Sequence, residues 1–223
     1  MAEVLSPDFW RDVQPGSIVV LSDAQALVEA VRQGLDGDGG LNYEVKRVLR
    51  VKSLNDLAEW MLLRLEGADD VWLMVKIAGQ AVDLRIYFEV PEFPAGNRAD
   101  LIAAEMYWLF EDPGPDWQAK YNDLKFTDRI DIDQGPGKQG LATQTRYHVK
   151  PFGAQYGGCT ELPSEPGAAP ALATIVEYLT ADPTDNPELL ILELGGEGDP
   201  HGGYIQMMLG CSMDPSDVRV FKK

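Results

Sequence analysis

Between Tyr43 and Val90 the chain alternates apolar and polar residues with the two-residue period of β-strands. Four runs carry this pattern, joined by short polar or glycine-containing turns: YEVKRVLRV, LAEWMLLRL, VWLMVKIAG and AVDLRIYFEV. In the first run one face carries Tyr43, Val45, Arg47, Leu49 and Val51, and the other carries Glu44, Lys46, Val48, Arg50 and Lys52. The alternation predicts an antiparallel meander with one buried and one wetter face.

Helical spacing of apolar residues predicts two helices beside this meander. The first follows a short strand in SIVVL, begins at Ser22 or Asp23, and ends at a group of glycines. Its apolar stripe comprises Leu27, Val28, Val31 and Leu35. The second helix lies in ADLIAAEMYWLF, between the breakers PEFPAGNR and EDPGPDW.

A second β-rich section follows and repeats the layout of the first. Its strands are predicted in RYHVKPFGAQYGG, ATIVEYLTA, ELLILELGG, GYIQMMLGC and DVRVFKK, with a proline-rich insertion at 162–170. Tyr43 and Val45 match Tyr147 and Val149, and GADDVWLMVKIAG parallels TDNPELLILELGG. Duplication explains these matches, but strands followed by glycine-rich turns also resemble one another for purely physical reasons.

These elements predict an α+β protein that is predominantly antiparallel β: two β-meander sections packed together, with a few peripheral helices. The N-terminal section spans residues 1–111 and the C-terminal section spans 145–223. Residues 112–144, rich in Asp, Gly and Pro, form a predicted irregular connection holding a strand or two near KFTDRIDID. With 223 residues, the chain is expected to form one compact unit.

The charge of the chain excludes some partners and favours others. Thirty-six acidic and nineteen basic residues give a formal net charge of -17, which repels phosphate backbones and anionic lipids. Nucleic-acid binding is therefore not expected, and the acidic surface serves solubility or attracts a basic protein partner. Because the sequence shows neither a signal-peptide pattern nor a membrane-length apolar run, we expect a cytoplasmic protein without direct membrane insertion.

No constellation in the sequence predicts catalysis or a cofactor. Cys159 and Cys211 lie in no metal-binding motif, and His148 and His201 are far apart in sequence. Glu59, Glu89, Glu177 and Glu193 fall in or beside apolar strands. Such carboxylates form a site if they share a pocket, but strand periodicity favours outward-pointing positions on a wet face.

Two further segments carry candidate sites. Asp128, Asp131 and Asp133 resemble a calcium-binding turn, although the EF-hand pattern fails at Gly135 and Ala142 and favours a solvated acidic turn. The aromatic-rich stretch around FEVPEFPAGNR contains residues suited to an exposed recognition edge. These interaction candidates are Phe93, Asn97, Arg98 and Trp108.

The runs YEVKRV, VWLMVKI and LLILELGGEG, with the closing GYIQMMLGCSMDPSDVRVF, resemble the YjfK-like family of uncharacterised bacterial proteins. That resemblance implies no activity or catalytic residue. It implies a bacterial context beside relatives of the membrane-remodelling protein PspA, and hence an accessory role in the envelope stress response.

The sequence thus favours a non-enzymatic protein-interaction or accessory protein with a basic, PspA-like partner. One alternative is a small-ligand-binding protein or enzyme, with a pocket between the two β-sections that uses Glu59, Glu177, Glu193 and His148. A second alternative is an acidic inhibitor of a basic partner. The sequence leaves the oligomeric state open.

Overall fold

The structure, a computed structural model, describes residues 6–22, 42–66, 71–90, 93, 95–136, 142–164, 166–167, 169–180, 188–195 and 203–223. Its first half contains α1 (Pro7–Arg11), β1 (Ile18–Leu21), β2 (Asn42–Ser53), β3 (Glu59–Leu65), β4 (Val71–Ala78), β5 (Ala81–Glu89), β6 (Gly96–Asn97) and α3 (Arg98–Ala103). The 3-10 turn η1 (Tyr107–Leu109), α4 (Trp117–Lys120), the 3-10 turn η2 (Tyr121–Asp123), β7 (Arg129–Pro136) and β8 (Ala142–Leu162) follow. The chain continues through β9 (Ala171–Thr180), β10 (Glu188–Leu194), β11 (Tyr204–Met213), the 3-10 turn η3 (Pro215–Asp217) and β12 (Val218–Phe221).

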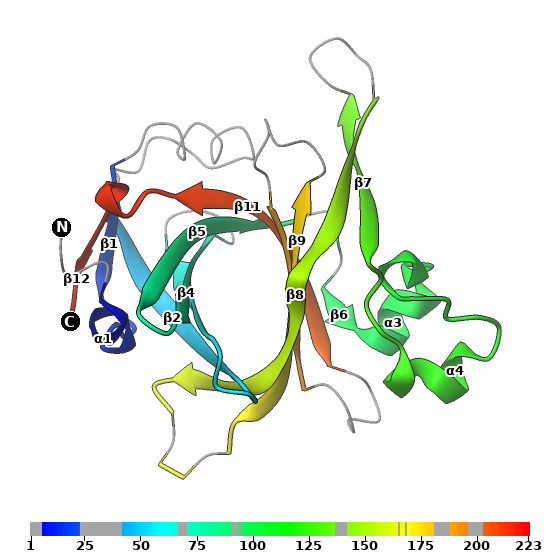
Figure 1. The fold of residues 1–223 in the computed structure, drawn as a ribbon, viewed down its shortest axis with the longest axis horizontal. Helices are drawn as coiled ribbons and strands as arrows, with labels where there is room; N and C mark the ends of the chain where they lie inside the picture. Colours follow the sequence, from blue (N-terminus) through cyan, green and yellow to red (C-terminus); the bar gives the residue numbers. More distant parts are fainter. Residues whose placement is uncertain are drawn as a thin grey trace. The chain divides into compact units, whose positions relative to one another are not determined.

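Hydrogen bonds link the strands in the order β12-β1-β2-β3-β4-β5-β11-β10-β9-β8-β7, and β2 also pairs with β8. The pairing of β2 with β8 therefore closes a ring of eight paired strands: β2, β3, β4, β5, β11, β10, β9 and β8. Figure 1 shows the elements in their chain order. The chain divides into two compact units, one comprising residues 1–89, 157–171 and 210–223 and the other 90–156 and 172–209, which we call unit 1 and unit 2.

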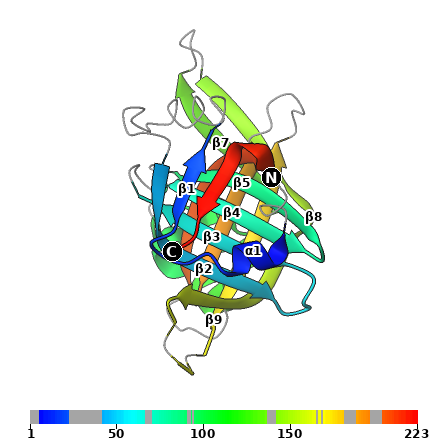
Figure 2. The same cartoon turned by 90° about the vertical axis from the view of Figure 1, so that its left-hand side faces the viewer.

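In unit 1, strands β2 to β5 pair antiparallel in sequence order. One face of this sheet packs against α1 and β1 (Figure 2). The side chains of Trp10, Val19, Leu63 and Leu73 belong to a single apolar cluster there. Burial of these side chains contributes about 1.5–3 kcal/mol each. The cluster explains why the short helix α1 stays on the sheet.

A β-bulge in β2 corrects the simple alternation expected for the first strand. The register with β3 shifts between Val45 and Arg47. As a result Val48 joins the same apolar cluster as Val45, whereas the alternation placed these two residues on opposite faces. The expected wetter face is wrong for the central strands, because Trp60 and Met61, neighbours on β3, are both fully buried.

Gly157 lies where β8 passes very close to the backbone of β2. It pairs with Ser53, and a Cβ atom at this position would collide with the backbone carbonyl of Lys52. Only glycine allows the two strands to approach this closely. The Pro- and Gly-containing run PFGAQYGG, in which this glycine lies, is therefore part of one long strand rather than a break between two.

In unit 2, β9 and β10 pair antiparallel and bury one face against α3 and η1. The shared apolar cluster includes Tyr178, Ile191, Leu101 and Leu109. The hairpin of β7 and β8 pairs Ile130 with Tyr147, and both side chains are buried in the same cluster.

The predominantly antiparallel β architecture with few helices is confirmed, as are the four strands predicted between Tyr43 and Val90. The helix expected after Ser22 lies outside the described residues. The helix expected at 99–110 is shorter, because α3 ends at Ala103 and only a 3-10 turn follows. The connection expected to be irregular contains α4, η2 and β7, and the proposed section boundaries 1–111, 112–144 and 145–223 stay predictions.

Within the described residues, none of the helices has the length and apolar character needed to cross a lipid bilayer.

Candidate functional site

Two exposed aromatic side chains stand on η1 in unit 2. Tyr107 is 52% exposed and Trp108 is 40% exposed, whereas the next two residues, Leu109 and Phe110, are buried. The turn therefore points one pair of side chains outward while the following pair holds it to the core. Exposed tyrosine and tryptophan are enriched in the energetic centres of protein interfaces.

Carboxylates surround this pair in the sequence between residues 98 and 128. The exposed acidic residues of the segment are Asp100, Glu105, Glu111, Asp112, Asp116, Asp123 and Asp128. Its exposed basic residues are Lys120 and Lys125. We use the name aromatic-acidic surface for Tyr107, Trp108 and these seven acids, which are grouped by their exposure and by their nearness in the sequence. Its negative charge favours a partner surface rich in lysine or arginine.

Two residues of this surface hold left-handed backbone conformations that side chains other than glycine rarely adopt. Glu105 has a φ of 64° and Asp112 a φ of 32°, and they bracket η1. Each costs on the order of 1–3 kcal/mol and persists only where the surrounding structure imposes it. The turn that carries the aromatic pair is therefore held in a defined shape.

The aromatic-acidic surface is anchored by Arg98, at the start of α3. Its Nε and Nη2 donate to Oε1 and Oε2 of Glu193 at 2.6 and 2.8 Å. Its Nη1 donates to the carbonyl oxygens of Leu124 and Tyr121 at 2.5 and 3.2 Å. The carboxylate is almost fully buried, so this ion pair joins β10 to α3 and to the end of η2 in a single network.

Two aromatic rings lie next to each other against the same guanidinium. Phe110 and Phe126 each lie with their ring centres 5.2 Å from the central carbon of Arg98, and 5.1 Å from one another. Two backbone hydrogen bonds join the segment after η1 to the segment after η2: the N–H of Glu111 donates to the carbonyl of Lys125, and the N–H of Thr127 donates to the carbonyl of Leu109. The result is a compact support directly beneath the exposed turn.

The four predicted interaction residues have different places in the structure. Trp108 is exposed, Phe93 is buried in the unit 2 cluster, and Arg98 has its donors occupied internally. Asn97 caps α3, because its side-chain oxygen accepts from the backbone N–H of Asp100 at 2.9 Å. Sequence reasoning missed Tyr107, although its position beside Trp108 and among acidic residues was a usable signal.

The predicted metal residues are not gathered around a common point in the described part of the chain. Asp131 accepts from Arg146 Nε at 2.8 Å and lies 3.7 Å from Arg129 Nη2. The hydrogen bond from Arg146 holds the pKa of Asp131 below its usual value. Asp128 is exposed, and Asp133 lies in β7 opposite Gln144. No cluster of three potential ligands occurs among the described residues, and the calcium site stays a prediction.

The expectation that the strand carboxylates point outward is wrong for Glu177 and Glu193, both of which are buried. Lys150 on β8 lies 2.9 Å from Glu188 and 3.8 Å from Glu177. Such burial requires ionic partners, which period-two patterns do not reveal. The other candidate in unit 2, His148, is exposed and lies opposite Arg129 on β7.

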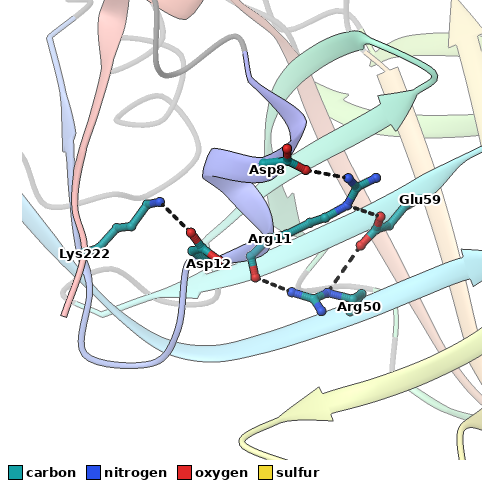
Figure 3. A network of polar contacts seen from close by, with 6 residues as sticks. All are labelled: Asp8, Arg11, Asp12, Arg50, Glu59 and Lys222. Atoms are coloured by element: carbon teal, nitrogen blue, oxygen red, sulfur yellow. Dashed lines mark hydrogen bonds and ion pairs between the residues drawn. The ribbon is translucent and has the colours of Figure 1, made fainter.

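In unit 1 the remaining candidates have structural partners. Glu59 accepts from Arg11 Nε at 3.0 Å and forms an ion pair with Arg50 Nε at 3.3 Å, without hydrogen-bond geometry in the second contact (Figure 3). Arg50 Nη2 also donates to the carbonyl of Arg11 at 2.6 Å. Glu89 accepts from the indole of Trp72 at 2.7 Å. The contacts among Arg11, Glu59 and Arg50 hold α1 on the sheet.

Cys159 lacks the lowered thiol pKa that a catalytic nucleophile needs. Burial raises the pKa of the Cys159 thiol to about 11, which keeps it protonated at neutral pH. Cys211 is partly buried on β11, and the two cysteines form no disulfide in the described part of the chain.

No known protein family, curated protein or solved structure matches this chain.

Proposed function

We propose that this protein is a non-enzymatic interaction protein that binds a basic protein partner through its aromatic-acidic surface. The observation that carries the proposal is the exposure of Tyr107 and Trp108 on a turn supported by the buried Arg98–Glu193 pair. Burying two exposed aromatic rings against a partner supplies apolar area, and the surrounding carboxylates supply selectivity for basic residues.

The supporting structure favours tight binding because little has to be ordered when a partner arrives. Arg98 fixes α3, β10 and the end of η2 to one another through four hydrogen bonds. A surface that is already rigid loses less conformational entropy on association. The left-handed backbone at Glu105 is consistent with a turn shape retained for recognition.

The cellular context of the proposal comes from the resemblance to the YjfK-like family. That resemblance implies an accessory role in the bacterial envelope stress response, and a basic helical partner of the PspA type would suit the charge of the chain. The cytoplasmic location is a separate part of the proposal, expected from the sequence alone. The net charge of -17 supports a basic partner and disfavours nucleic acid.

The test is an affinity pull-down from lysate of the native host at low and high salt, followed by purification of the retained protein and measurement of its Kd. The expected result is a basic partner whose binding weakens at high salt and on Trp108→Ala or Tyr107→Ala. Tyr156→Ala is the matched control, because Tyr156 is an equally exposed aromatic residue on β8. An affinity that is insensitive to salt and to Trp108→Ala contradicts the proposal.

One observation favours the second candidate function, binding of a small ligand or catalysis on one. Glu177 and Glu188, both buried, lie around the single ammonium group of Lys150. Buried ionisable groups of this kind occur at functional sites as well as in structural networks. A thermal-shift screen of metabolites and metal ions tests it, with Glu177→Gln expected to abolish any shift that involves these residues.

The third candidate, an acidic inhibitor, shares the same surface and differs only in its partner. It predicts that the captured protein is a nucleic-acid-binding protein whose binding site becomes blocked.

We also infer that the two β-rich sections are related meanders. Tyr43 on β2 and Tyr147 on β8 match in sequence and are both buried. The parallel segments GADDVWLMVKIAG and TDNPELLILELGG contain β4 and β10, which are the third strands of the runs that begin with β2 and β8. Matching positions with matching burial support an internal duplication.

A further inference from the structure

We propose that the edge strand β12 binds an extended acidic peptide segment of a partner protein by strand addition. This site lies in unit 1 and is independent of the aromatic-acidic surface. β12 pairs with β1 along one side, with Val19 opposite Val220 and Leu21 opposite Val218, and it is the last strand in the order of pairings (Figure 1). Among the described strands, none lies along its other side. An unpaired edge presents backbone donors and acceptors to an incoming strand.

The edge is fixed in position at both ends. Before it, the Asp214 carboxylate accepts from the Ser216 backbone N–H at 2.8 Å and caps η3, and Ser22 N–H donates to the carbonyl of Asp217 at 2.8 Å. After it, Lys222 Nζ lies 3.3 Å from Asp12 and 4.2 Å from the ring centre of Phe9. A peptide that adds to β12 therefore meets a strand that is already extended, which lowers the entropic cost of binding.

The side chains of β12 define what kind of strand fits. Val218 is buried, whereas Arg219 and Phe221 are exposed on the opposite face, and Phe221 is 62% exposed. Residues 218–223 contain three cations and no acid, in a chain with a net charge of -17. Lys222 is paired with Asp12, and Arg219 and Lys223 are exposed. The edge therefore favours a strand that alternates acidic side chains with apolar ones.

The same charges disfavour a second copy of this chain as the occupant. Antiparallel pairing of two β12 strands would bring Arg219 and the following lysines of both copies together. Like charges across paired strands are destabilising. An acidic partner removes this repulsion, so the peptide and not a homodimer is the occupant that the charges support.

The test uses fluorescein-labelled peptides and anisotropy at low and physiological salt. The probe Ac-EVEVEV-NH2 has the proposed pattern, Ac-EGEGEG-NH2 has the same charge with a low tendency to form a strand, and Ac-KVKVKV-NH2 has the opposite charge. We expect the first peptide to bind at least about tenfold more tightly than the other two, a difference of about 1.4 kcal/mol. Equal binding of the two acidic peptides overturns strand addition, and failure of all three overturns the site.

Substitutions locate the binding to this edge. Arg219→Glu, on an exposed side chain, is expected to weaken binding of the first peptide about tenfold or more, and Phe221→Ser to weaken it as well. Lys52→Glu is the matched control, because Lys52 is an exposed cation of β2 in the same unit, and it is expected to change the affinity less than about twofold. Equal loss in Arg219→Glu and Lys52→Glu assigns the binding to net charge and overturns the proposal. Because Trp108→Ala leaves β12 untouched, its peptide affinity stays unchanged whether or not the proposed function holds.

Discussion

Arg98 and Glu193 lie 95 residues apart in the sequence and meet through two parallel hydrogen bonds inside unit 2. Their side chains are only 11% and 1% exposed. Both charges have been taken out of water, which is costly, and the two carbonyl oxygens and the two neighbouring phenylalanine rings that contact the guanidinium offset that cost. The pair therefore holds the support of the aromatic-acidic surface in place.

Removal of one partner of this pair is expected to be more damaging than removal of both. Glu193→Leu leaves a buried guanidinium without its counter-charge and should lower the free energy of unfolding by about 3–5 kcal/mol. Arg98→Met combined with Glu193→Leu removes the buried charge and should recover part of that loss. Urea denaturation followed by tryptophan fluorescence measures both, and a double variant less stable than Glu193→Leu contradicts this account.

The left-handed backbone of Glu105 predicts a stabilising substitution. Glu105→Gly removes the contact between Cβ and the backbone and is expected to raise the free energy of unfolding by about 0.5–1 kcal/mol. Ala104→Gly is the control, since Ala104 has an ordinary φ of -84° and the change should destabilise by a similar amount. Thermal melts of both variants measure the effect. If the melting temperature shifts in the same direction in both, Glu105 is not strained.

Exposure predicts that Trp108 is dispensable for folding, although it is central to the proposed binding. Trp108→Ala is expected to change the free energy of unfolding by less than about 0.5 kcal/mol. Trp10→Ala, at a fully buried position on α1, is expected to cost about 3–5 kcal/mol. Chemical denaturation of the two variants tests this contrast. A large loss in Trp108→Ala would show that the residue is structural.

The buried thiol predicts a difference in reactivity and a pH dependence. The pKa of Cys159 is raised from its ordinary value near 9 to about 11, mainly by burial, while the charge of Arg47 lowers it and the charge of Glu161 raises it. Its contribution to stability is fully present below the ordinary pKa and is lost as the pH rises through 9 to 11. Iodoacetamide at pH 8 should therefore modify Cys211 faster than Cys159, as read by mass spectrometry.

Cys159→Ala provides the control for the pH effect. In this variant the decline of stability between about pH 9 and 11 should be shallower than in the wild type, because one titrating group has been removed. If the free energy of unfolding falls with pH at the same rate in both proteins, groups other than Cys159 cause the decline.

The strands were predictable because local pattern decides them, whereas the supporting site was not. YEVKRVLRV alternates apolar and polar residues and VWLMVKIAG is a short apolar run, so β2 and β4 follow from the sequence. The bulge between Val45 and Arg47 depends on the register with β3, which no local pattern specifies. The sequence predicts Arg98 on an exposed recognition edge, and this is wrong. Its partner Glu193 belongs to a strand 95 residues away, so no local pattern reveals the ion pair. Trp108 was predictable since the acidic, proline-flanked sequence that follows it is typical of a surface turn.

The pairing of β1 with β12 sets a condition on the order in which unit 1 folds. Ile18 lies opposite Phe221, so nearly the entire chain separates two strands that are hydrogen-bonded neighbours. During synthesis, β1 can pair with β12 only after Phe221 has left the ribosome. Contacts between such distant segments are slow to form, in the range of milliseconds to seconds for proteins of this topology. Nascent chains released before β12 leave β1 as an open edge, and that exposed strand is where we expect aggregation of truncated products to begin.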